Sequence, residues 1–422
     1  MPESSLPLPL PPDSMAFAFW HATESLARVM AGRSLAEGFL QDIPAIARPQ
    51  ARHMVYGVLR RYGEGEALLS PLLRETPRIN IMALLLLAVY CLESRPSKSH
   101  TVINQAVKTA TLLEGGYYRN LVNGVLRNFV RRREALFATL PETARLWHPD
   151  WWIARLKAAY PNNWQDIVAA CNLHPPMALR VNLRRTTQAA CLQRLEEAGM
   201  EAELRGSCGL LLKQPVPVDR LPGFQEGELS VQDLGAQRAA QILSPSAGAR
   251  VLDACAAPGG KASHLLEQGD NLTLVAHDID PARCQRIRDN LARLGLTAQV
   301  RVADAAATFG DGKDQYDAIM ADLPCSSSGV ARRFSDVKWL RREADIVNYA
   351  KTQARILAGL WPLLQKRGKL LYATCSLFPQ ENEDQIGSFL KQNPDASLQH
   401  EEHCLPDAEQ DGFYYALLQK QF

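Results

Sequence analysis

The chain has 422 residues, of which 46% are hydrophobic and 22% charged, and its formal net charge is +2. One ordinary hydrophobic core cannot account for this length, so two or three domains are expected, and the composition is that of a soluble globular protein. Nine cysteines occur with neither a C-x-x-C pair nor a histidine cluster at zinc spacing. This usage argues against a metal site and, without a secretory segment, indicates reduced thiols in the cytoplasm.

Charge is distributed unevenly along the chain. Residues 1–140 contain 16 Lys and Arg against 11 Asp and Glu, whereas residues 381–422 contain 2 against 9. A basic N-terminal region favours a polyanionic partner, although solvated helix faces alone give the same imbalance.

The N-terminal region is predicted to be an all-helical bundle. Residues 1–15 are proline-rich and indicate a flexible lead-in. Over residues 16–140, apolar residues recur at helical spacing between Gly, Pro and Ser breaks. The most apolar run, Ile79–Tyr90, has 12 residues, too few to span a bilayer, and fits a buried core helix. The predicted helices are Phe17–Ala31, Pro49–Tyr62, Ile79–Leu92, Thr101–Leu113 and Arg119–Leu136.

The last of these helices carries a cluster of arginines near its end, formed by Arg127, Arg131, Arg132 and Arg133. Cations are favourable near a helix C-terminus because they complement the helix dipole. The same cluster also suits a phosphate-binding patch. The sequence leaves both interpretations open.

Residues 141–235 are interpreted as a linker followed by a small α+β module. After the Pro175-Pro176 break, the sequence MALRVNL, a helix over Gln188–Ala198 and the sequence GLLLKQP suggest a β-α-β arrangement. The stretch LPGFQEGELSVQD then predicts a turn and a strand that lead into the last domain.

Residues 236–422 alternate between strands and helices, which predicts a parallel sheet covered on both faces. The clearest helix is Pro281–Leu294, with Asp280 as its N-cap and Gly295 as its stop. A helix over Glu383–Lys391 and a final strand, FYYALLQK, follow near the C-terminus. The strands are predicted in ARVLDAC, LTLVAHDI, AQVRVADA, YDAIMADL and GKLLYATC.

A small-residue turn follows the first of these strands, in Val251–Lys261 (VLDACAAPGGK). A strand, a glycine turn and a helix are the layout in which a parallel sheet holds the charged part of a nucleotide-like cofactor. Pro-Gly-Gly alone is also an ordinary turn.

Acidic residues follow the predicted strands at their carboxyl ends, where ligands bind in such sheets. Asp278 lies 19 residues after Gly259 and suits ribose hydroxyls, and Asp304 suits an adenine amino group. Each Asp alone is common in turns and caps, but the series with Asp253 and Asp322 favours a cofactor site. Because the turn lacks the full G-x-G-x-x-G spacing, a dinucleotide is the weaker interpretation.

Two cysteines follow strands that we expect to be neighbours, Cys325 in DLPCSSSG and Cys375 in YATCS. Adjacent strands lie about 4.8 Å apart, so both thiols can face one substrate. A lone cysteine is usually a small buried hydrophobe. A pair beside a cofactor site favours a nucleophile that adds to an electron-poor ring and makes the neighbouring carbon nucleophilic.

The motifs DACAAPGGK, HDID, ADLPCSSSGV and YATCS resemble those of the bacterial ribosomal RNA cytosine-5 methyltransferases of the Sun/Fmu (RsmB) type. Stretches such as YRNLVNGVLRNF and PPMALRVN extend the resemblance over residues 15–395. It implies a NusB-like RNA-binding domain over residues 16–140, the small module over 141–235 and a Rossmann-like methyltransferase domain over 236–422. It further implies a cytoplasmic monomer that methylates C5 of a cytosine in 16S rRNA.

The resemblance also implies roles for single residues. Asp278 would bind the ribose of S-adenosylmethionine, Asp304 its adenine, and Asp322 its amino group or the substrate base. Cys375 would add to C6 of cytosine, and Cys325 would assist proton removal and release of the enzyme. The methionine end of the cofactor would lie against Cys255, Ala256, Ala257, Pro258, Gly259, Gly260 and Lys261.

Three positions depart from the motifs of the family that the chain resembles. Leu323 stands where Ala is usual, Ala262 where Thr is usual, and His277 where a small or apolar residue is typical. These differences leave the chemistry intact and bear on cofactor affinity.

A second basic segment, Arg332–Arg342, follows the Cys325 motif and contains Arg332, Arg333, Lys338, Arg341 and Arg342. A solvated helix end is one interpretation, but its place beside the cysteines favours contacts with RNA phosphates. The target cytosine must leave any stack to reach both cysteines, so we expect a flipped or unpaired base.

Two other function classes fit parts of the sequence. A non-catalytic RNA-binding protein with a decayed transferase would use only the N-terminal region, and the intact motifs count against it. A nicotinamide-dependent oxidoreductase would use the glycine turn but would leave the paired cysteines without a role. Titration with each cofactor separates these classes.

Overall fold

The computed structural model describes residues 9–307 and 315–421. The chain divides into two compact units, here called the helical unit (Met1–Arg155 with Phe334–Arg342) and the sheet unit (Leu156–Arg333 with Glu343–Phe422). The first eight residues of the predicted lead-in lie outside the described ranges. Among the described residues, no helix combines the length and the apolarity needed to cross a membrane.

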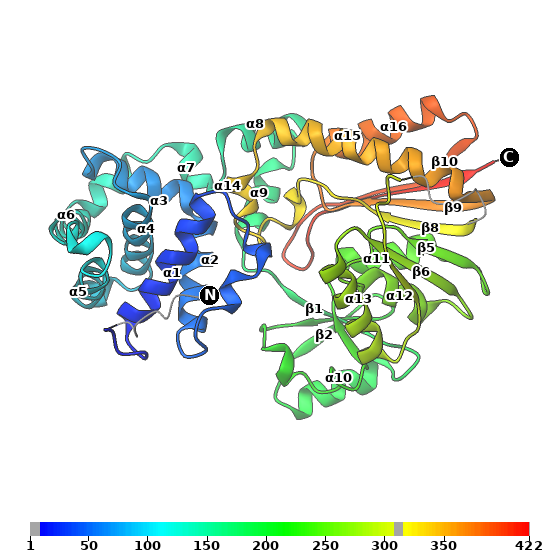
Figure 1. Ribbon diagram of the computed structural model, residues 1–422, viewed down its shortest axis with the longest axis horizontal. Coiled ribbons are helices and arrows are strands. Elements are labelled where there is room, and N and C mark those ends of the chain that lie inside the picture. The colour runs from blue at the N-terminus through cyan, green and yellow to red at the C-terminus, as the bar shows by residue number, and fades with distance from the viewer. Residues whose placement is uncertain (1–8, 308–314, 422) are drawn as a thin grey trace. The chain divides into compact units, whose positions relative to one another are not determined.

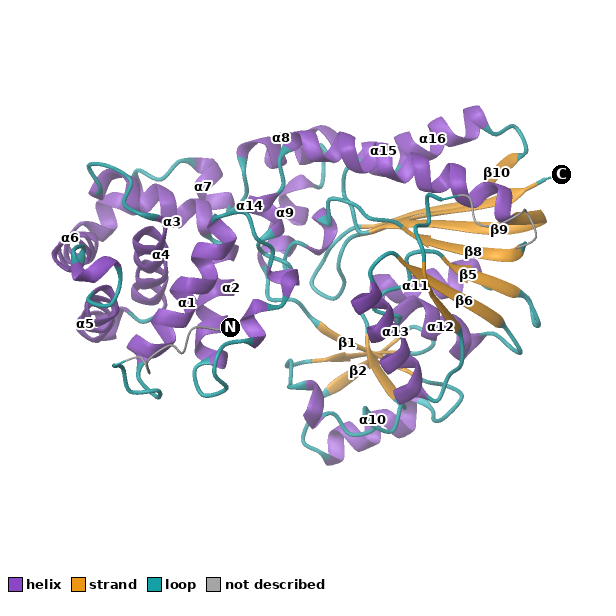
Figure 2. Ribbon diagram, viewed as in Figure 1, coloured by secondary structure: helices purple, strands orange, loops and turns teal. Residues whose placement is uncertain are grey.

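The helical unit is built from helices alone among its described residues (Figure 2). Helix α1 begins after Ser14, whose side chain caps the helix by accepting from the backbone N–H of Phe17 at 3.2 Å. The helices are α1 (Met15–Met30), α2 (Arg48–Arg60), α3 (Tyr62–Leu69), α4 (Ile79–Ser94), α5 (Ser99–Ala110), α6 (Arg119–Ala138), α7 (Glu142–Leu146) and α14 (Val337–Leu340). The predicted helical bundle is confirmed.

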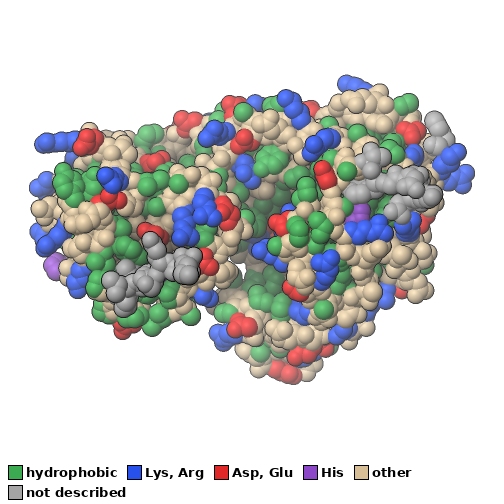
Figure 3. Space-filling view, in the orientation of Figure 1, with side chains coloured by type: hydrophobic (Ala, Val, Ile, Leu, Met, Phe, Trp, Pro, Cys, Tyr) green, Lys and Arg blue, Asp and Glu red, His purple; other side chains and the backbone are tan. Residues whose placement is uncertain are grey.

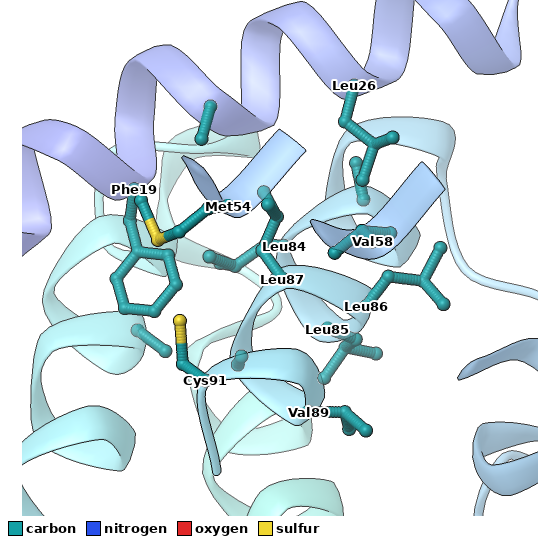
Figure 4. Packing of buried hydrophobic residues seen from close by; sticks show 14 of the residues in the cluster. Phe19, Leu26, Met54, Val58, Leu84, Leu85, Leu86, Leu87, Val89 and Cys91 are labelled. Atoms are coloured by element: carbon teal, nitrogen blue, oxygen red, sulfur yellow. The ribbon is translucent and has the colours of Figure 1, made fainter. Parts of the chain in front are cut away.

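The apolar helix α4 forms the centre of the helical unit. Its residues from Ile81 to Val89 are buried on every side, as expected for a helix that is hydrophobic all round. Phe19 and Leu26 of α1 and Met54 and Val58 of α2 pack around it (Figure 4).

The sequence did not predict helix α3, because its two glycines resemble a break. The structure shows close packing at both glycines: a Cβ at Gly65 would lie 2.8 Å from Cδ2 of Leu86, and one at Gly63 would lie 3.0 Å from the ring of Trp339. Both glycines therefore allow close packing at a modest cost in helix propensity.

Segment Phe334–Arg342 lies within the helical unit although it follows the Cys325 motif in sequence. Lys338 is fully buried and donates from Nζ to the carbonyl oxygens of Arg60 (3.0 Å) and Trp147 (2.9 Å). Trp339 donates from Nε1 to the carbonyl oxygen of Leu59 at 2.6 Å. The expectation that Lys338 contacts RNA phosphates is therefore wrong, because its ammonium is used inside the bundle.

The sheet unit begins at Leu156, within α8 (Asp150–Ala159), and continues with α9 (Trp164–Asn172) and a small antiparallel sheet of order β2-β3-β1-β4. Its elements are β1 (Met177–Val181), α10 (Gln188–Glu197), β2 (Ala202–Arg205), β3 (Gly209–Leu212) and β4 (Leu229–Val231). The α+β class is confirmed. The simple β-α-β arrangement is wrong, since β2 was missed and β1 pairs antiparallel with β3 and β4.

The larger sheet has the order β10-β11-β9-β8-β5-β6-β7. Its core strands, β5 to β9, are parallel, as predicted. Strands β11 and β10 extend it antiparallel as a hairpin, so the sheet is mixed rather than wholly parallel. The strands are β5 (Arg250–Asp253), β6 (Thr273–Asp278), β7 (Gln299–Val302), β8 (Tyr316–Asp322), β9 (Leu364–Thr374), β10 (Ala396–Cys404) and β11 (Phe413–Lys420).

Helices cover both faces of this sheet (Figure 1). Helices α11 (Leu234–Leu243), α12 (Gly260–Gln268) and α13 (Pro281–Leu294) pack on the face that includes Val251 and Met320. Helices α15 (Glu343–Leu360) and α16 (Glu383–Gln392) pack on the opposite face, which includes Leu252 and Ile319. Successive residues alternate between the two layers, as the pleat of a strand requires.

Candidate active site

The carboxyl ends of the parallel strands meet at one edge of the larger sheet. Strand β5 ends at Asp253, β6 at Asp278 and β8 at Asp322, and β9 ends one residue before Cys375. Asp253 pairs in register with Met320 of β8, and Asp322 pairs with Ala373 of β9. The structure therefore brings the predicted acids and both cysteine motifs to the same edge.

The predicted cofactor turn leaves β5 and enters α12 at Gly260. Gly259 has φ 99°, a left-handed conformation that favours glycine. A Cβ at Gly259 would lie 3.4 Å from the Cα of Ile287, whereas one at Gly260 would meet only Gln232 at 3.9 Å. The turn thus packs against α13 on one side and leaves a small-residue cradle at the start of α12.

Asp278 holds the other side of this turn. Its side chain is buried, accepts from the backbone N–H of Ala257 (3.3 Å) and of Asp280 (3.1 Å), and lies 3.5 Å from Nη1 of Arg283. Asp280 caps α13 as predicted, accepting from the N–H of Ala282 at 2.7 Å. The HDID motif therefore has two structural roles: Asp278 supports the cofactor turn, and Asp280 caps the start of α13.

Lys261 and Asp322 form an ion pair at the centre of the strand edge, with 2.5 Å between Nζ and Oδ2. The Lys261 ammonium also lies 5.5 Å from the ring centre of Phe413. Burial alone would lower the pKa of Lys261, but the carboxylate of Asp322 outweighs it and raises that pKa. Burial, together with the charge of Asp322, raises the pKa of nearby Asp253 to about 7.

The two cysteine side chains meet across the ends of β8 and β9, with 3.4 Å between their Sγ atoms. Cys325 is 5% exposed, whereas Cys375 is partly accessible. The hydrogen bond with Cys375, followed by burial, raises the pKa of the Cys325 thiol well above its usual value. Cys325 is thus held as a neutral thiol, and Cys375 is the more accessible sulfur.

Comparisons with known proteins agree with this arrangement. The family model for 16S rRNA methyltransferase RsmB/F matches residues 240–419, that of the RsmF/B-like ferredoxin-like domain matches 148–219, and that of the NusB family matches 21–131. Ribosomal RNA small subunit methyltransferase B of Salmonella paratyphi B is 42% identical over 386 residues, covering 87% of this chain and 90% of that protein. The chain belongs to the RsmB/F methyltransferase family. The Salmonella typhi protein of the same name is 41% identical over the same shares of both chains.

Solved structures give the same result for the fold of this RsmB/F member. The crystal structure of PH0851 superposes with a TM-score of 0.78 at 25% identity, covering 98% of this chain and all of that one. A methyltransferase homolog protein from Pyrococcus horikoshii gives 0.58 at 26% identity and covers 67% of this chain. The NusB-like helical domain, the small module and the Rossmann-like methyltransferase domain are thereby confirmed.

Arg180, which no sequence motif singled out as functional, anchors the helix that follows the cofactor turn. Arg180 is fully buried on β1 and forms two hydrogen bonds of 2.8 Å with the carboxylate of Glu267. It also donates to the carbonyl oxygen of Gly260 (2.8 Å) and to Ser263 Oγ (3.0 Å). The RVN stretch carries this arginine, but its partners lie far along the sequence and only the fold reveals them.

Two apolar residues beside the predicted adenine position were also missed. Ile279 is 64% exposed directly after Asp278, and Val302 is 51% exposed at the end of neighbouring strand β7. Asp304 follows and accepts from the N–H of Ala306 at 2.9 Å. Exposed aliphatic side chains at adjacent strand ends are suited to the faces of a planar ring, a signal that the HDID motif already contained.

The RNA-contact role expected for Arg332 and Arg333 is wrong. Arg332 is 1% exposed and donates from Nε to Asp411 at 2.5 Å. Arg333 forms ion pairs with Asp411 and, at 2.7 Å, with Asp233. Both guanidinium groups are therefore engaged by buried carboxylates and fix the chain that follows the Cys325 motif.

Proposed function

We propose that this RsmB/F member transfers a methyl group from S-adenosylmethionine to C5 of a cytosine in 16S rRNA through a covalent cysteine–C6 intermediate. The observation that carries the proposal is the pair of thiols, 3.4 Å apart, at the strand edge that also holds the cofactor turn. Two sulfurs at one site suit a reaction that needs a nucleophile in one step and a second thiol in a later one.

The residues at the strand edge fit S-adenosylmethionine. The cradle at Gly259 and Gly260 accepts its methionine end, Asp278 presents a carboxylate for ribose hydroxyls, and Ile279 and Val302 offer apolar surface to adenine. Asp304 would bind the adenine amino group. When bound, the cofactor supplies an electrophilic methyl group. The turn residues expected to hold it are Cys255, Ala256, Ala257, Pro258, Gly259, Gly260 and Lys261.

Cys375 is the proposed nucleophile. Its thiolate adds to C6 of the cytosine, and the electron pair of the C5–C6 double bond makes C5 nucleophilic toward the methyl group. The neutral Cys325 thiol beside it can donate a hydrogen bond to the Cys375 sulfur. Lys261, held by Asp322, adds a positive charge that favours an anion at this edge.

Cys325 is proposed to act in the second half of the reaction. After C5 is methylated, loss of the C5 proton re-forms the double bond as the bond between C6 and the Cys375 sulfur breaks. The Cys325 thiol lies 3.4 Å from that sulfur and gives its proton to the departing Cys375 thiolate. The Cys325 thiolate formed in this way takes up the C5 proton, so Cys325 assists both proton removal and release of the enzyme. Asp322 lies at the same edge and would bind the cofactor amino group or the base.

The rest of the chain is proposed to deliver the RNA. The proposal assigns RNA binding to residues 16–140, a supporting role to 141–235 and the reaction to 236–422. The target cytosine is expected to be flipped or unpaired, because a stacked base cannot reach both sulfurs. One chain carries every residue assigned to the reaction, so the proposal requires neither a second subunit nor a metal, and we place the enzyme in the cytoplasm.

The decisive experiment compares Cys375→Ala and Cys325→Ala on an unmethylated 16S rRNA fragment. Cys375→Ala should abolish methylation and form no covalent RNA adduct. Cys325→Ala should add Cys375 to the base and then stall, which leaves a protein–RNA complex that survives denaturing gel electrophoresis. Cys191→Ala, at a buried cysteine of the small module, is the control. If Cys375→Ala formed the covalent adduct and Cys325→Ala did not, Cys325 would be the nucleophile and Cys375 would act in the second step.

Cofactor binding has a separate test in Asp278→Ala. Loss of a charged hydrogen-bond acceptor should weaken S-adenosylmethionine binding by roughly 1.5–3 kcal/mol, or about one to two decades in Kd. Calorimetric titration with S-adenosylmethionine and, in parallel, with a nicotinamide dinucleotide identifies the cofactor class. If the Asp278→Ala protein bound S-adenosylmethionine with wild-type affinity, Asp278 would not be part of the cofactor site.

A further inference from the structure

A buried polar cluster lies directly beneath the two cysteines, centred on Glu381. Glu381 is fully buried at the end of a short turn, Pro379–Glu381, just before α16. Its backbone carbonyl accepts from the hydroxyl of Tyr372 in β9 at 2.5 Å. The residue is therefore anchored to the strand that ends at Cys375.

The carboxylate of Glu381 connects the residues that follow each cysteine. Oε1 accepts from the backbone N–H of Ser326 at 2.7 Å, and Oε2 accepts from its hydroxyl at 2.6 Å. Oε2 also accepts from the hydroxyl of Ser376 at 2.5 Å. Since Ser326 follows Cys325 and Ser376 follows Cys375, one side chain holds both cysteine loops.

Further hydrogen bonds complete this link. Ser328 Oγ accepts from the N–H of Leu377 at 2.7 Å and lies 3.2 Å from Ser326 Oγ and 3.3 Å from Ser376 Oγ. The N–H of Gly329 donates to the carbonyl oxygen of Cys375 at 2.8 Å. The hydroxyls of Ser326, Ser328 and Ser376 thus form a network in which Ser326 and Ser376 donate to the Glu381 carboxylate.

A buried carboxylate is unfavourable unless its hydrogen bonds are satisfied with good geometry. Burial raises the pKa of Glu381, and the hydrogen bonds from Ser326 and Ser376 oppose that effect. An apolar side chain would fill the same space without this conflict. A fully satisfied polar network instead specifies one arrangement of the groups that it joins.

We propose that Glu381 is a positioning residue that sets the separation of the Cys325 and Cys375 sulfurs. The proposal deepens the proposed function, on which it rests, because a two-thiol reaction needs both sulfurs at one base. Catalytic groups must be held within about 0.5 Å of their productive positions. Glu381 meets this need through the backbone and side chain of Ser326 and the side chain of Ser376.

The test measures the separation of the sulfurs without using methylation. Diamide oxidises two neighbouring thiols to a disulfide and takes up their two electrons and two protons. In resting protein, without RNA or cofactor, the Cys325–Cys375 disulfide should form roughly tenfold more slowly in Glu381→Gln. The amide cannot accept from the two serine hydroxyls, the Ser326 N–H and Gln353 Nε2 together, so the loops lose their alignment. Mass spectrometry of the linked peptides identifies this disulfide among those of the other cysteines.

Two further variants keep the test decisive. Ser376→Ala removes the hydroxyl that links Glu381 to the Cys375 loop and that accepts from the N–H of Phe378, and it should also slow disulfide formation. Asp384→Asn, at an exposed position of neighbouring α16, is the matched control and should oxidise at the wild-type rate. The alkylation rate of Cys375 by iodoacetamide and the affinity for S-adenosylmethionine should stay unchanged, which a general loss of structure would not allow.

The outcomes separate this proposal from the proposed function. Slower disulfide formation, together with a lower kcat and unchanged KM for the cofactor, supports positioning by Glu381. Wild-type oxidation rates in Glu381→Gln and Ser376→Ala overturn the positioning role even where the cysteine adducts form as proposed. Slower oxidation combined with full methylation by Cys375→Ala would keep the positioning role and overturn the two-thiol reaction.

Discussion

Two arginine-rich segments with similar sequences have opposite environments in the structure. The α6 arginines (Arg127, Arg131, Arg132 and Arg133) are exposed on α6, which is seen nearly end-on in Figure 1. Arg332 and Arg333, by contrast, are held by Asp411 and Asp233 inside the sheet unit. The first segment is available to a polyanion, and the second serves the fold.

The difference lies in acidic partners that are distant in sequence. Asp411 is 79 residues from Arg332, so no local pattern associates the two. The α6 arginines have local partners instead: Arg127 donates to Asn123 at 3.1 Å and Arg131 to Asn128 at 2.7 Å. On the face shown in Figure 3, Lys and Arg side chains are interspersed with acidic and apolar ones. Burial, not charge density, therefore distinguishes an arginine that serves the fold from one that is exposed to solvent.

The largest effect is expected from Arg332→Ala. This change leaves the buried carboxylate of Asp411 without one of its arginines, and breaking a buried pair costs about 3–5 kcal/mol. Urea denaturation should show that loss, whereas Arg127→Ala as the matched exposed control should leave stability within about 0.5 kcal/mol of wild type. Equal stability of the two variants would abolish the contrast between the segments.

Lys338→Ala extends the contrast to the helical unit. The change leaves the carbonyl oxygens of Arg60 and Trp147 without the ammonium that they share. An unpaired buried polar group costs about 1–3 kcal/mol, and the contact with Trp147 is only partly buried, so the free energy of unfolding should fall by about 1–3 kcal/mol in total. RNA affinity measured at a temperature where the protein remains folded should not change. A loss of RNA affinity without a loss of stability would show that Lys338 contacts RNA.

The triple change of Arg127, Arg131 and Arg132 to Ala tests RNA affinity rather than stability. RNA binding should weaken roughly ten- to hundredfold, and the slope of log K against log salt should become less steep by about two to three, because up to three phosphate contacts are lost. Cofactor affinity and stability should not change. Filter binding at several salt concentrations is the measurement, and an unaltered slope would make the cluster an ordinary helix end.

The smallest effect is expected from Arg133→Ala. Arg133 forms hydrogen bonds of 2.7 and 2.8 Å with the carboxylate of Glu93, and its side chain is 46% exposed. Such surface pairs contribute at most about 1 kcal/mol. Since the pairing occupies the guanidinium, this variant should bind RNA nearly as well as wild type in the same filter assay. A loss equal to that of the triple variant would show that RNA displaces Glu93.

Local patterns were sufficient to predict most of the fold. Helix α13 begins after Asp280 and ends at Gly295, as the cap and stop signals indicate. Helix α3 was missed because its glycines are explained only by Leu86 and Trp339, which are distant in sequence. Strand β10 was missed because its exposed polar residues are paired through the register with β11.

The candidate site residues that lie in short sequence motifs could be predicted. Asp278 and the two cysteines lie at strand ends, where periodicity alone places them. Glu381 and Arg180 could not be predicted, because each acts through partners from other elements: Ser326 for the first and Glu267 for the second. Candidate site residues at strand ends are thus readable from the sequence, whereas the residues that contact and support them are found only from three-dimensional contacts.

The position of segment Phe334–Arg342 in the helical unit has a consequence for biosynthesis. N-terminal domains generally fold first as a chain leaves the ribosome. Here the carbonyl oxygens of Arg60 and Leu59 accept hydrogen bonds from Lys338 and Trp339. These bonds cannot form until residues 156–333 have been synthesised. A prematurely terminated product therefore carries an unfinished bundle, which exposes it to proteases. The helical unit can therefore be completed only on chains that already contain the Cys325 loop.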